Sequence, residues 1–278
     1  LARWAGERGI ACAGAIDAIA AVTGGRPFDY LFSVVNEHIL SREILSLPRR
    51  GAINYHDGPL PRYAGTHVTS WALIRGEKTH GVTWHLIDDG VDTGDILQQV
   101  NFETSANETA VALNARCYEA AIRSFDALVE ELCAGRLQPT PQNLAERTFY
   151  PRFKRPPGAC VISWGASATE IDALVRALEF GPYVNPLGCP KVVLDEGFVI
   201  PRATDVLDET SGMPAGTVVA IEPRGIRVAT GTQDLILRRL TTVDGDELSV
   251  AAATSRYGLV AGCRLSEVDE STVERIDD

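Results

Sequence analysis

The chain has 278 residues, of which 45% are hydrophobic and 23% charged, and its formal net charge is −11. This composition is typical of a globular protein with one large domain or two smaller ones. No apolar run approaches the roughly 20 residues of a membrane-spanning helix, so we expect no membrane partner. The six cysteines are scattered without a C-x-x-C pair, which disfavours a zinc site or a disulfide framework and favours a cytoplasmic location.

The first half of the chain alternates predicted strands with predicted helices. Residues 28–35 form a mostly apolar run that is typical of a strand buried on both faces. The elements expected after it are a helix at 41–47, a strand at 52–56, a helix at 66–75 with Thr66 as N-cap, strands at 81–87 and 96–100, and a helix at 107–134 that ends at Gly135. This alternation predicts an α/β layer fold with a largely parallel sheet.

The second half has a different pattern. Residues 138–157 hold several prolines and no apolar periodicity, so we expect a linker there. A helix at 169–180 is followed by short predicted strands separated by turn residues, at 191–194, 198–201, 216–221, 225–229 and 235–240. We therefore expect a catalytic domain at 1–137 and a small β-rich, barrel-like domain at 158–278.

Asn54 and His56 lie two positions apart at the end of the predicted strand 52–56. Their side chains leave the same face of the strand, and the carboxyl ends of strands are where α/β sheets bind ligands. Histidine accepts protons near neutral pH, and an asparagine amide donates a hydrogen bond that stabilises an oxyanion. An isolated N-x-H pair is, however, more often a turn-forming asparagine beside a hydrogen-bonded histidine.

A loop of closely spaced carboxylates lies downstream, at residues 88–95. It contains four aspartates, Asp88, Asp89, Asp92 and Asp95, with Gly90 and Gly94 between them. Their mutual repulsion requires a cationic neighbour, which a metal, an amine substrate or a protonated histidine would supply. A calcium loop is one alternative, although Gln99 stands where that loop carries a bidentate glutamate. A solvated acidic turn is the other.

The N-x-H pair, the Leu60-Pro61 loop and the D-x-G-x-D-T-G-D segment together resemble the formyltransferase family, which includes methionyl-tRNA, glycinamide ribonucleotide and amino-sugar N-formyltransferases. The resemblance implies a Rossmann-like domain that uses 10-formyltetrahydrofolate as co-substrate, without a metal. It implies that Asn54, His56 and Asp92 are catalytic. The folate-binding residues that it implies are Val35, Asn36, Leu60, Pro61, Asp88, Asp89 and Gly90.

The sequence departs from this family in two places. The loop reads Asp57-Gly58-Pro59-Leu60-Pro61, where relatives usually carry a small residue followed by S-L-L-P. We expect the first strand of the fold to be missing before Leu1, either because the chain is trimmed or because it is part of a longer polypeptide with downstream domains. The segment from His56 to Gly65 also resembles formyltransferase-like domains at the head of nonribosomal peptide synthetases.

The resemblance predicts acyl transfer to an amine, and two alternatives remain open: hydrolysis of formyl-folate and a non-catalytic domain. Residues 205–278 hold fourteen acidic residues against seven arginines and no lysine, a balance of −7 that disfavours a phosphate backbone. The basic cluster Arg147, Arg152, Lys154 and Arg155 is interpreted as a solvated linker. We therefore expect a small-molecule amine or a carrier-protein-bound amine as acceptor, and no tRNA.

Overall fold

A computed structural model describes residues 2–36, 38–195 and 197–267 of the chain. The chain divides into two compact units, each assembled from separate stretches of sequence. The first unit comprises Leu1–Ala64, Gly81–Asn101 and Cys117–Phe149, and the second comprises Gly65–His80, Phe102–Arg116 and Tyr150–Asp278. Among the described residues, no helix has both the length and the apolar character needed to cross a membrane.

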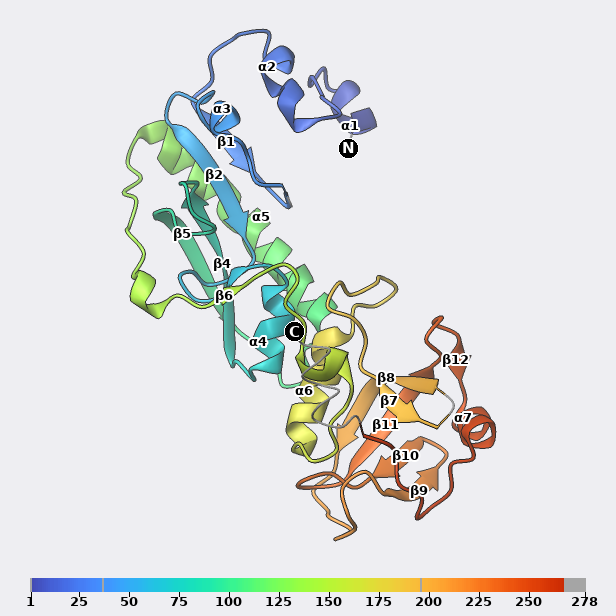
Figure 1. Cartoon of the computed structure of the whole chain (residues 1–278). Helices are drawn as coiled ribbons and strands as arrows, with labels where there is room; N and C mark the ends of the chain where they lie inside the picture. The colour runs from blue at the N-terminus through green and yellow to red at the C-terminus, as the bar shows by residue number, and fades with distance from the viewer. Residues whose placement is uncertain (1, 37, 196, 268–278) are drawn as a thin grey trace. The chain divides into compact units, whose positions relative to one another are not determined.

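The elements follow one another along the colour gradient of Figure 1. The first half contains α1 (Ala2–Gly6), η1 (Ile16–Ala18), α2 (Ile19–Val22), β1 (Tyr30–Ser33), α3 (Arg42–Leu45), β2 (Gly51–His56), β3 (Ala64–Gly65), α4 (Val68–Ile74), β4 (Thr79–Leu86), β5 (Ile96–Glu103) and α5 (Ala110–Ala134). The second half contains η2 (Leu144–Glu146), β6 (Phe149–Tyr150), η3 (Pro157–Cys160), α6 (Ala168–Leu178), β7 (Val192–Leu194), β8 (Gly197–Val206), β9 (Val218–Glu222), β10 (Gly225–Val228), β11 (Leu235–Thr241), β12 (Glu247–Leu248) and α7 (Val250–Tyr257).

A four-stranded sheet with the order β1-β2-β4-β5 forms the Rossmann-like part, which confirms the predicted fold class. Strand β1 pairs parallel with β2, so Ser33 lies opposite Asn54. Strand β4 is antiparallel to β2, with His85 opposite Asn54 and Thr83 opposite His56. The four-stranded sheet therefore combines parallel and antiparallel pairing, and the alternating pattern of residues 81–87 indicated a strand but not its direction.

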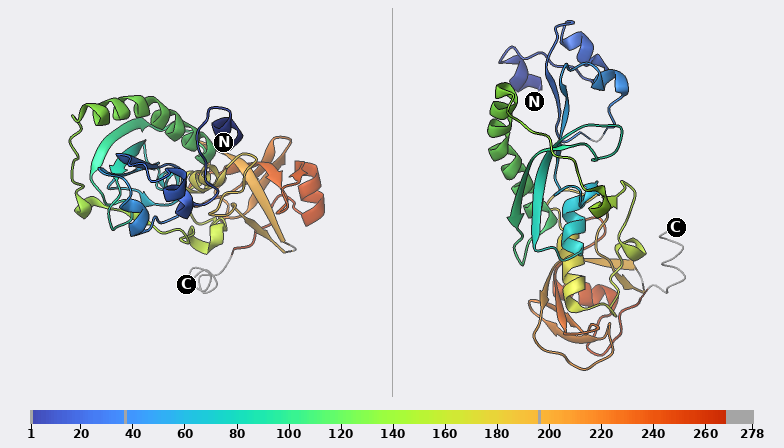
Figure 2. Two further views of the ribbon diagram at one scale, coloured as in Figure 1. Left: turned by 90° about the horizontal axis from the view of Figure 1, so that it is seen from above. Right: turned by 90° about the vertical axis from the view of Figure 1, so that its left-hand side faces the viewer.

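An aromatic cluster fills the space between this sheet and α5, which runs along one face of the sheet in Figures 1 and 2. The ring of Phe32 lies 5.4 Å from that of Phe125, and Trp84 lies 5.5 Å from Phe125. The indole nitrogen of buried Trp84 donates a 3.0 Å hydrogen bond to Ser124 on α5. Large aromatic side chains provide most of the buried apolar area in such a contact and thereby fix the helix against the strands.

The chain differs from expectation just before α4. His67, with φ +57°, is the N-cap residue of this helix and makes no side-chain cap. Thr66 was expected to be the cap, but its backbone N–H donates to the carbonyl of Tyr150 across the two-stranded sheet of β3 and β6. The prediction of a Thr66 cap is wrong because strand pairing between distant segments takes that residue first.

The second unit contains an antiparallel sheet with the order β7-β8-β11-β10-β9, with β12 paired to β11. The sheet curls into a half-barrel, which confirms the predicted barrel-like domain. Its core surrounds the fully buried Trp164 and joins α6 to the strands. Helix α6 begins with a capping box, in which Ser167 and Glu170 satisfy each other's backbone N–H groups.

Candidate active site

The carboxyl end of β2 carries two of the candidate catalytic residues on one face of the strand. His56 is buried and Asn54 is half-buried. Tyr55 points to the opposite face and joins the aromatic cluster beneath α5, with its ring 5.4 Å from Trp84. The period of two in β2 therefore separates a polar face from an apolar core face, as the sequence predicted.

Asp92 reaches this polar face from the loop between β4 and β5. Its carboxylate Oδ2 lies 3.7 Å from Nδ1 of His56, and its Oδ1 lies 3.6 Å from Nε2 of His85. The Asp92 backbone has φ +55°, a left-handed conformation that non-glycine residues rarely adopt. The structure thus brings together all three residues that the motif comparison selected.

His85 is a fourth polar residue of the site, and the sequence interpretation did not select it. Its Nδ1 lies 2.8 Å from the carbonyl of Leu86, and its Nε2 lies 3.2 Å from Nδ2 of Asn54. Because a carbonyl only accepts, Nδ1 carries the proton of the neutral ring, and Nε2 accepts from the Asn54 amide. In the sequence, Thr83 and His85 alternate with apolar residues in the predicted strand. This alternation indicates that His85 faces the site only when β4 is known to pair with β2.

The tautomer of His56 follows from the same argument. Its Nε2 lies 2.7 Å from the backbone carbonyl of Tyr63, so this nitrogen carries a proton. Its other nitrogen, Nδ1, faces the carboxylates of Asp92 at 3.7 Å and Asp57 at 4.0 Å. In the neutral ring, Nδ1 is therefore the nitrogen that can accept a proton, and it faces the Asp92 carboxylate.

The Leu60-Pro61 loop is attached to the sheet by hydrogen bonds. Thr83 Oγ1 donates to the carbonyl of Gly58 at 2.8 Å and accepts from the N–H of Leu60 at 3.2 Å. Gln99 Nε2 donates to the carbonyl of Leu60 at 2.8 Å. Leu60 is buried, and both of its backbone groups already have partners. A ligand would therefore contact the surface of this loop, and the Leu60 backbone groups would not need to bond to it.

The other residues that the resemblance assigned to folate lie in two places. Exposed Val35 and half-buried Asn36 follow the end of β1, where Asn36 donates to the carbonyl of His38. Asp88, Asp89 and Gly90 lie exposed in the loop after β4. There Asp88 accepts from the N–H of Gly90 and from the hydroxyl of Thr93, and Asp89 pairs with Arg42 at 3.2 Å.

The acidic residues of this loop face different partners. Asp92 faces two histidines, Asp88 is bonded within its own turn, and Asp89 pairs with an arginine. Within the described part of the chain, no three His, Cys, Asp or Glu side chains gather as a group that could hold a metal ion. Of the cationic neighbours considered for the loop, the structure places histidine next to Asp92.

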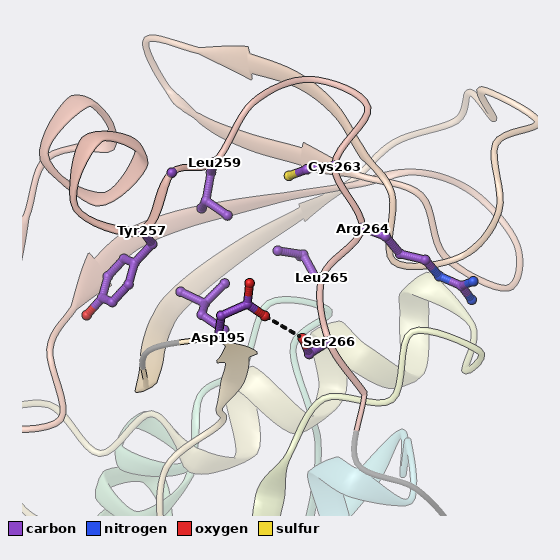
Figure 3. A pocket seen from close by; sticks show the side chains of 9 residues that line it. Asp195, Tyr257, Leu259, Cys263, Arg264, Leu265 and Ser266 are labelled. Carbon is purple, nitrogen blue, oxygen red and sulfur yellow. Dashed lines mark hydrogen bonds between the residues drawn. The ribbon is translucent and has the colours of Figure 1, made fainter.

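A separate hollow lies in the second unit, among Tyr257, Cys263, Arg264 and the residues around them (Figure 3). It encloses about 90 Å³, and the hydroxyl of Ser266 lies 3.5 Å from Asp195 in its wall. Its lining residues belong to the second unit, and none of them is among the candidate catalytic residues on the polar face of β2.

An α/β domain of this kind followed by an antiparallel half-barrel matches the class of formyltransferases. The formyl transferase family model matches residues 26–129, and the model for the formyl transferase C-terminal domain matches residues 156–258. The chain belongs to the formyltransferase family, and its homologues are enzymes that transfer a one-carbon group. The predicted family and enzyme class are confirmed.

Three relatives in sequence are methionyl-tRNA formyltransferases. The methionyl-tRNA formyltransferase of Clostridium perfringens strain SM101 is 30% identical over 222 residues, which cover 80% of this chain and 69% of that protein. That of Thermosynechococcus vestitus is 33% identical over 248 residues, covering 86% of this chain and 72% of that protein. The enzyme from Methylacidiphilum infernorum is 33% identical over 236 residues, with coverage of 84% and 71%.

Solved structures with the same fold are more distant in sequence. The sugar 3N-formyl transferase WlaRD, determined with dTDP and 5-N-formyl-tetrahydrofolate, has a TM-score of 0.66 at 18% identity and covers 86% of this chain and 80% of its own. An N-formyltransferase from Helicobacter canadensis, in complex with folinic acid and dTDP-3-aminofucose, has a TM-score of 0.66 at 19% identity, with coverage of 86% and 82%. HypX from Aquifex aeolicus has a TM-score of 0.66 at 16% identity and covers 92% of this chain and 46% of its own.

These relatives contradict the expectation that tRNA plays no part. The most similar sequences reported above are methionyl-tRNA formyltransferases by name. The error came from using net charge as a measure of local surface. A sum over residues 205–278 does not count the exposed Arg152, Lys154 and Arg155, which precede that range. Nucleic acids respond to the local arrangement of cations, which a total conceals.

Proposed function

We propose that this chain transfers the formyl group of 10-formyltetrahydrofolate to the primary amine of an aminoacyl group, with Asn54, His56 and Asp92 as its catalytic residues. The observation that carries the proposal is the Asp92 carboxylate, which lies 3.7 Å from His56 and 3.6 Å from His85 beside the Asn54 amide. A hydrogen-bond donor for an oxyanion and a site for a proton are the two groups that this reaction needs.

The reaction begins when the neutral amine attacks the formyl carbon and its nitrogen forms the new bond. One N–H of the Asn54 amide is engaged by His85, and the second is left to stabilise the developing oxyanion. Collapse of the intermediate breaks the bond between the formyl carbon and the folate nitrogen. The proton that the amine loses passes to the His56–Asp92 pair and then to that nitrogen, which yields the formamide and tetrahydrofolate.

Asp92 has two roles in this proposal. Its charge stabilises His56 once that ring is protonated, and its second oxygen faces His85, which contacts Asn54. A carboxylate that orients an imidazole and stabilises its charged form is a recurring element of histidine-based catalysis. Asp92 thus lies next to the proton acceptor His56 and next to the histidine that contacts the oxyanion donor.

The folate co-substrate is assigned to the polar edge between the end of β1 and the loop after β4. Exposed Val34 and Val35 offer apolar surface for a flat ring, and the adjoining Asn36 offers an amide. Asp88 and Gly90 lie in the exposed loop after β4. All of these residues fall within 1–137, so we assign catalysis to that region and acceptor recognition to 158–278, with residues 138–157 between them.

The proposed acceptor is the α-amine of an amino acid that is held by its carboxyl group, on tRNA or on a carrier protein. An α-amine has a pKa of about 8, against about 10.4 for a lysine side chain, so far more of it is unprotonated and nucleophilic at neutral pH. The names of the sequence relatives support the tRNA-borne ester. The resemblance to domains of nonribosomal peptide synthetases supports the thioester of a carrier protein within a cytoplasmic assembly.

A panel of acceptors tests the proposal. Purified protein is mixed with 10-formyltetrahydrofolate and, separately, methionyl-tRNA, an aminoacyl thioester on a carrier protein, a dTDP-amino sugar, or buffer alone. We expect tetrahydrofolate to form only with an aminoacyl acceptor, and mass spectrometry to find the formamide on its α-nitrogen. Release of formate in buffer alone would instead identify a hydrolase, and transfer only to the amino sugar would refute the aminoacyl assignment.

A further inference from the structure

The loop that carries Asp92 is held from outside by a segment that the sequence predicted to be a linker. Gln142 Nε2 donates to the backbone carbonyl of Asp92 at 3.0 Å and to that of Gly94 at 2.6 Å. Arg147 donates to the carbonyl of Val91 at 2.8 Å. Three carbonyls within four consecutive residues of the loop are thus bound by two side chains of one segment.

This segment is itself fixed in place. Thr140 and Ile96 exchange two backbone hydrogen bonds of 2.8 Å, which align the segment with the start of β5. The guanidinium carbon of Arg147 lies 4.6 Å from the centre of the Phe149 ring, and β6 pairs with β3. Gln142 therefore contacts the loop from a supported backbone.

The Asp92 backbone requires such support. At φ +55° this non-glycine residue is in a sparsely populated backbone region, and such a conformation persists only when neighbouring contacts impose it. The same residue must direct its carboxylate toward His56 and His85 on the neighbouring strands. The hydrogen bonds from Gln142 to the carbonyls of Asp92 and Gly94 fix two peptide groups that follow the Asp92 α-carbon, and Arg147 binds the carbonyl of the peptide group that precedes it.

We infer that Gln142 is a positioning residue, which holds the strained Asp92 backbone so that the carboxylate faces His56 and His85. The inference rests on the proposed function of Asp92. Both bonded loop atoms are carbonyl oxygens, so only the amide nitrogen of Gln142 fits them. Its Oε1 is buried and has no hydrogen-bond partner among the described residues. A carboxylate of the same shape would place an oxygen against two oxygens and release the loop.

Gln142→Glu tests this, with the same change at exposed Gln138 as the matched control. We expect kcat for formyl transfer to fall about 10- to 100-fold in Gln142→Glu, because small misplacements of catalytic groups carry penalties of that size. The KM values for both substrates should change less than about threefold if only the catalytic group moves. Gln138→Glu should retain the wild-type kcat.

A double-mutant cycle separates positioning from a general structural effect. If Gln142 acts through Asp92, then adding Gln142→Glu to Asp92→Asn should lower kcat by less than about twofold beyond Asp92→Asn alone. If the fold-decrease in kcat of the double variant equals the product of the decreases in the two single variants, the inference is overturned. A wild-type kcat in Gln142→Glu would also overturn it.

Hydrogen exchange gives a readout that does not depend on turnover. In Gln142→Glu we expect amides of residues 88–95 to exchange at least about tenfold faster, with little change in β2. If exchange in this loop is unchanged in Gln142→Glu, Gln142 does not hold the loop, whatever the formyl-transfer activity of that variant is. If Asp92→Asn keeps full activity while exchange in residues 88–95 accelerates in Gln142→Glu, the proposed catalytic role of Asp92 fails. The contact by which Gln142 holds the loop is then still supported.

Discussion

Asp92 Oδ2 and His56 Nδ1 lie 3.7 Å apart, at the point where the loop after β4 meets the end of β2. This separation is longer than a hydrogen bond, whose usual limit is about 3.2 Å. Sites that act by proton transfer often show such lengths without substrate and shorten when it binds. The two groups therefore lie close enough to act as one unit after a small movement of the loop.

The first prediction concerns this unit. We expect His56→Ala and Asp92→Ala each to lower kcat by at least about 100-fold, the contribution typical of a positioned acid or base. The kcat of the double variant should be little lower than that of the less active single variant, because the two residues act together. Turnover assays measure this, and circular dichroism checks the fold. Near-normal turnover in either single variant would refute the assignment.

Asn54→Ala tests the oxyanion donor. Removing one such donor typically lowers kcat by about 100- to 1000-fold, with a smaller effect on KM. Asn54→Asp keeps the shape and replaces the amide nitrogen that contacts His85 with an oxygen, so it should be as inactive as the alanine variant. Recovery of activity in Asn54→Asp would show that shape alone matters at this position.

Gly58 should not tolerate a side chain. A Cβ built there would lie 2.8 Å from Nε2 of His56 and 2.8 Å from the carbonyl of Tyr63, which is closer than real contacts allow. Gly58→Ala should therefore displace His56 and lower kcat at least about tenfold. Gly14→Ala, where nothing lies within 4 Å of an added Cβ, is the control and should keep wild-type kinetics.

Trp71→Ala should lower stability. Trp71 is 3% exposed within α4, and its ring stacks on Tyr150 at 5.0 Å. Truncating a large core aromatic residue typically costs about 3–5 kcal/mol of unfolding free energy. Denaturant titration measures the change, and Trp4→Ala, at a tryptophan that is 52% exposed, should have little effect. Equal losses in the two variants would contradict the burial difference.

Tyr55→Phe should reduce the loss of stability at alkaline pH. Burial, and next the charge of Asp57, raise the pKa of the Tyr55 hydroxyl above its ordinary value near 10. Above pH 10 the unfolded chain therefore releases a proton that the folded state keeps, so the unfolding free energy falls by up to about 1.4 kcal/mol per pH unit. Below pH 10 this contribution is constant.

Urea titrations between pH 8 and 11 measure this dependence. The decline above pH 10 should be shallower in Tyr55→Phe than in wild type. Tyr183→Phe, at an exposed tyrosine, should leave the decline unchanged. The Tyr55 hydroxyl has no hydrogen-bond partner among the described residues, so its removal should also raise stability at neutral pH by about 1 kcal/mol. Identical pH profiles for wild type and Tyr55→Phe would contradict the burial of this hydroxyl.

Local pattern in the sequence was sufficient for several of the strands and helices, β2, α5 and α6 among them, and for one face of the site. Residues 52–56 were predicted to form a strand, which gives Asn54 and His56 the same direction because side chains two positions apart in a strand lie on one face. Periodicity likewise predicted α5 and α6. These features depend on interactions within a few residues, so they can be inferred without knowing where the rest of the chain lies.

Only the tertiary structure decided which groups surround that face. His85 lies opposite Asn54 because β4 is antiparallel to β2, and Gln142 reaches the Asp92 loop from a segment whose prolines predicted a linker. Strand direction and long-range side-chain bonds depend on contacts between distant residues, and local periodicity does not encode them. The same limit applies to charge: a net value of −11 is a property of composition, whereas recognition of a phosphate backbone depends on where Arg152, Lys154 and Arg155 lie in space.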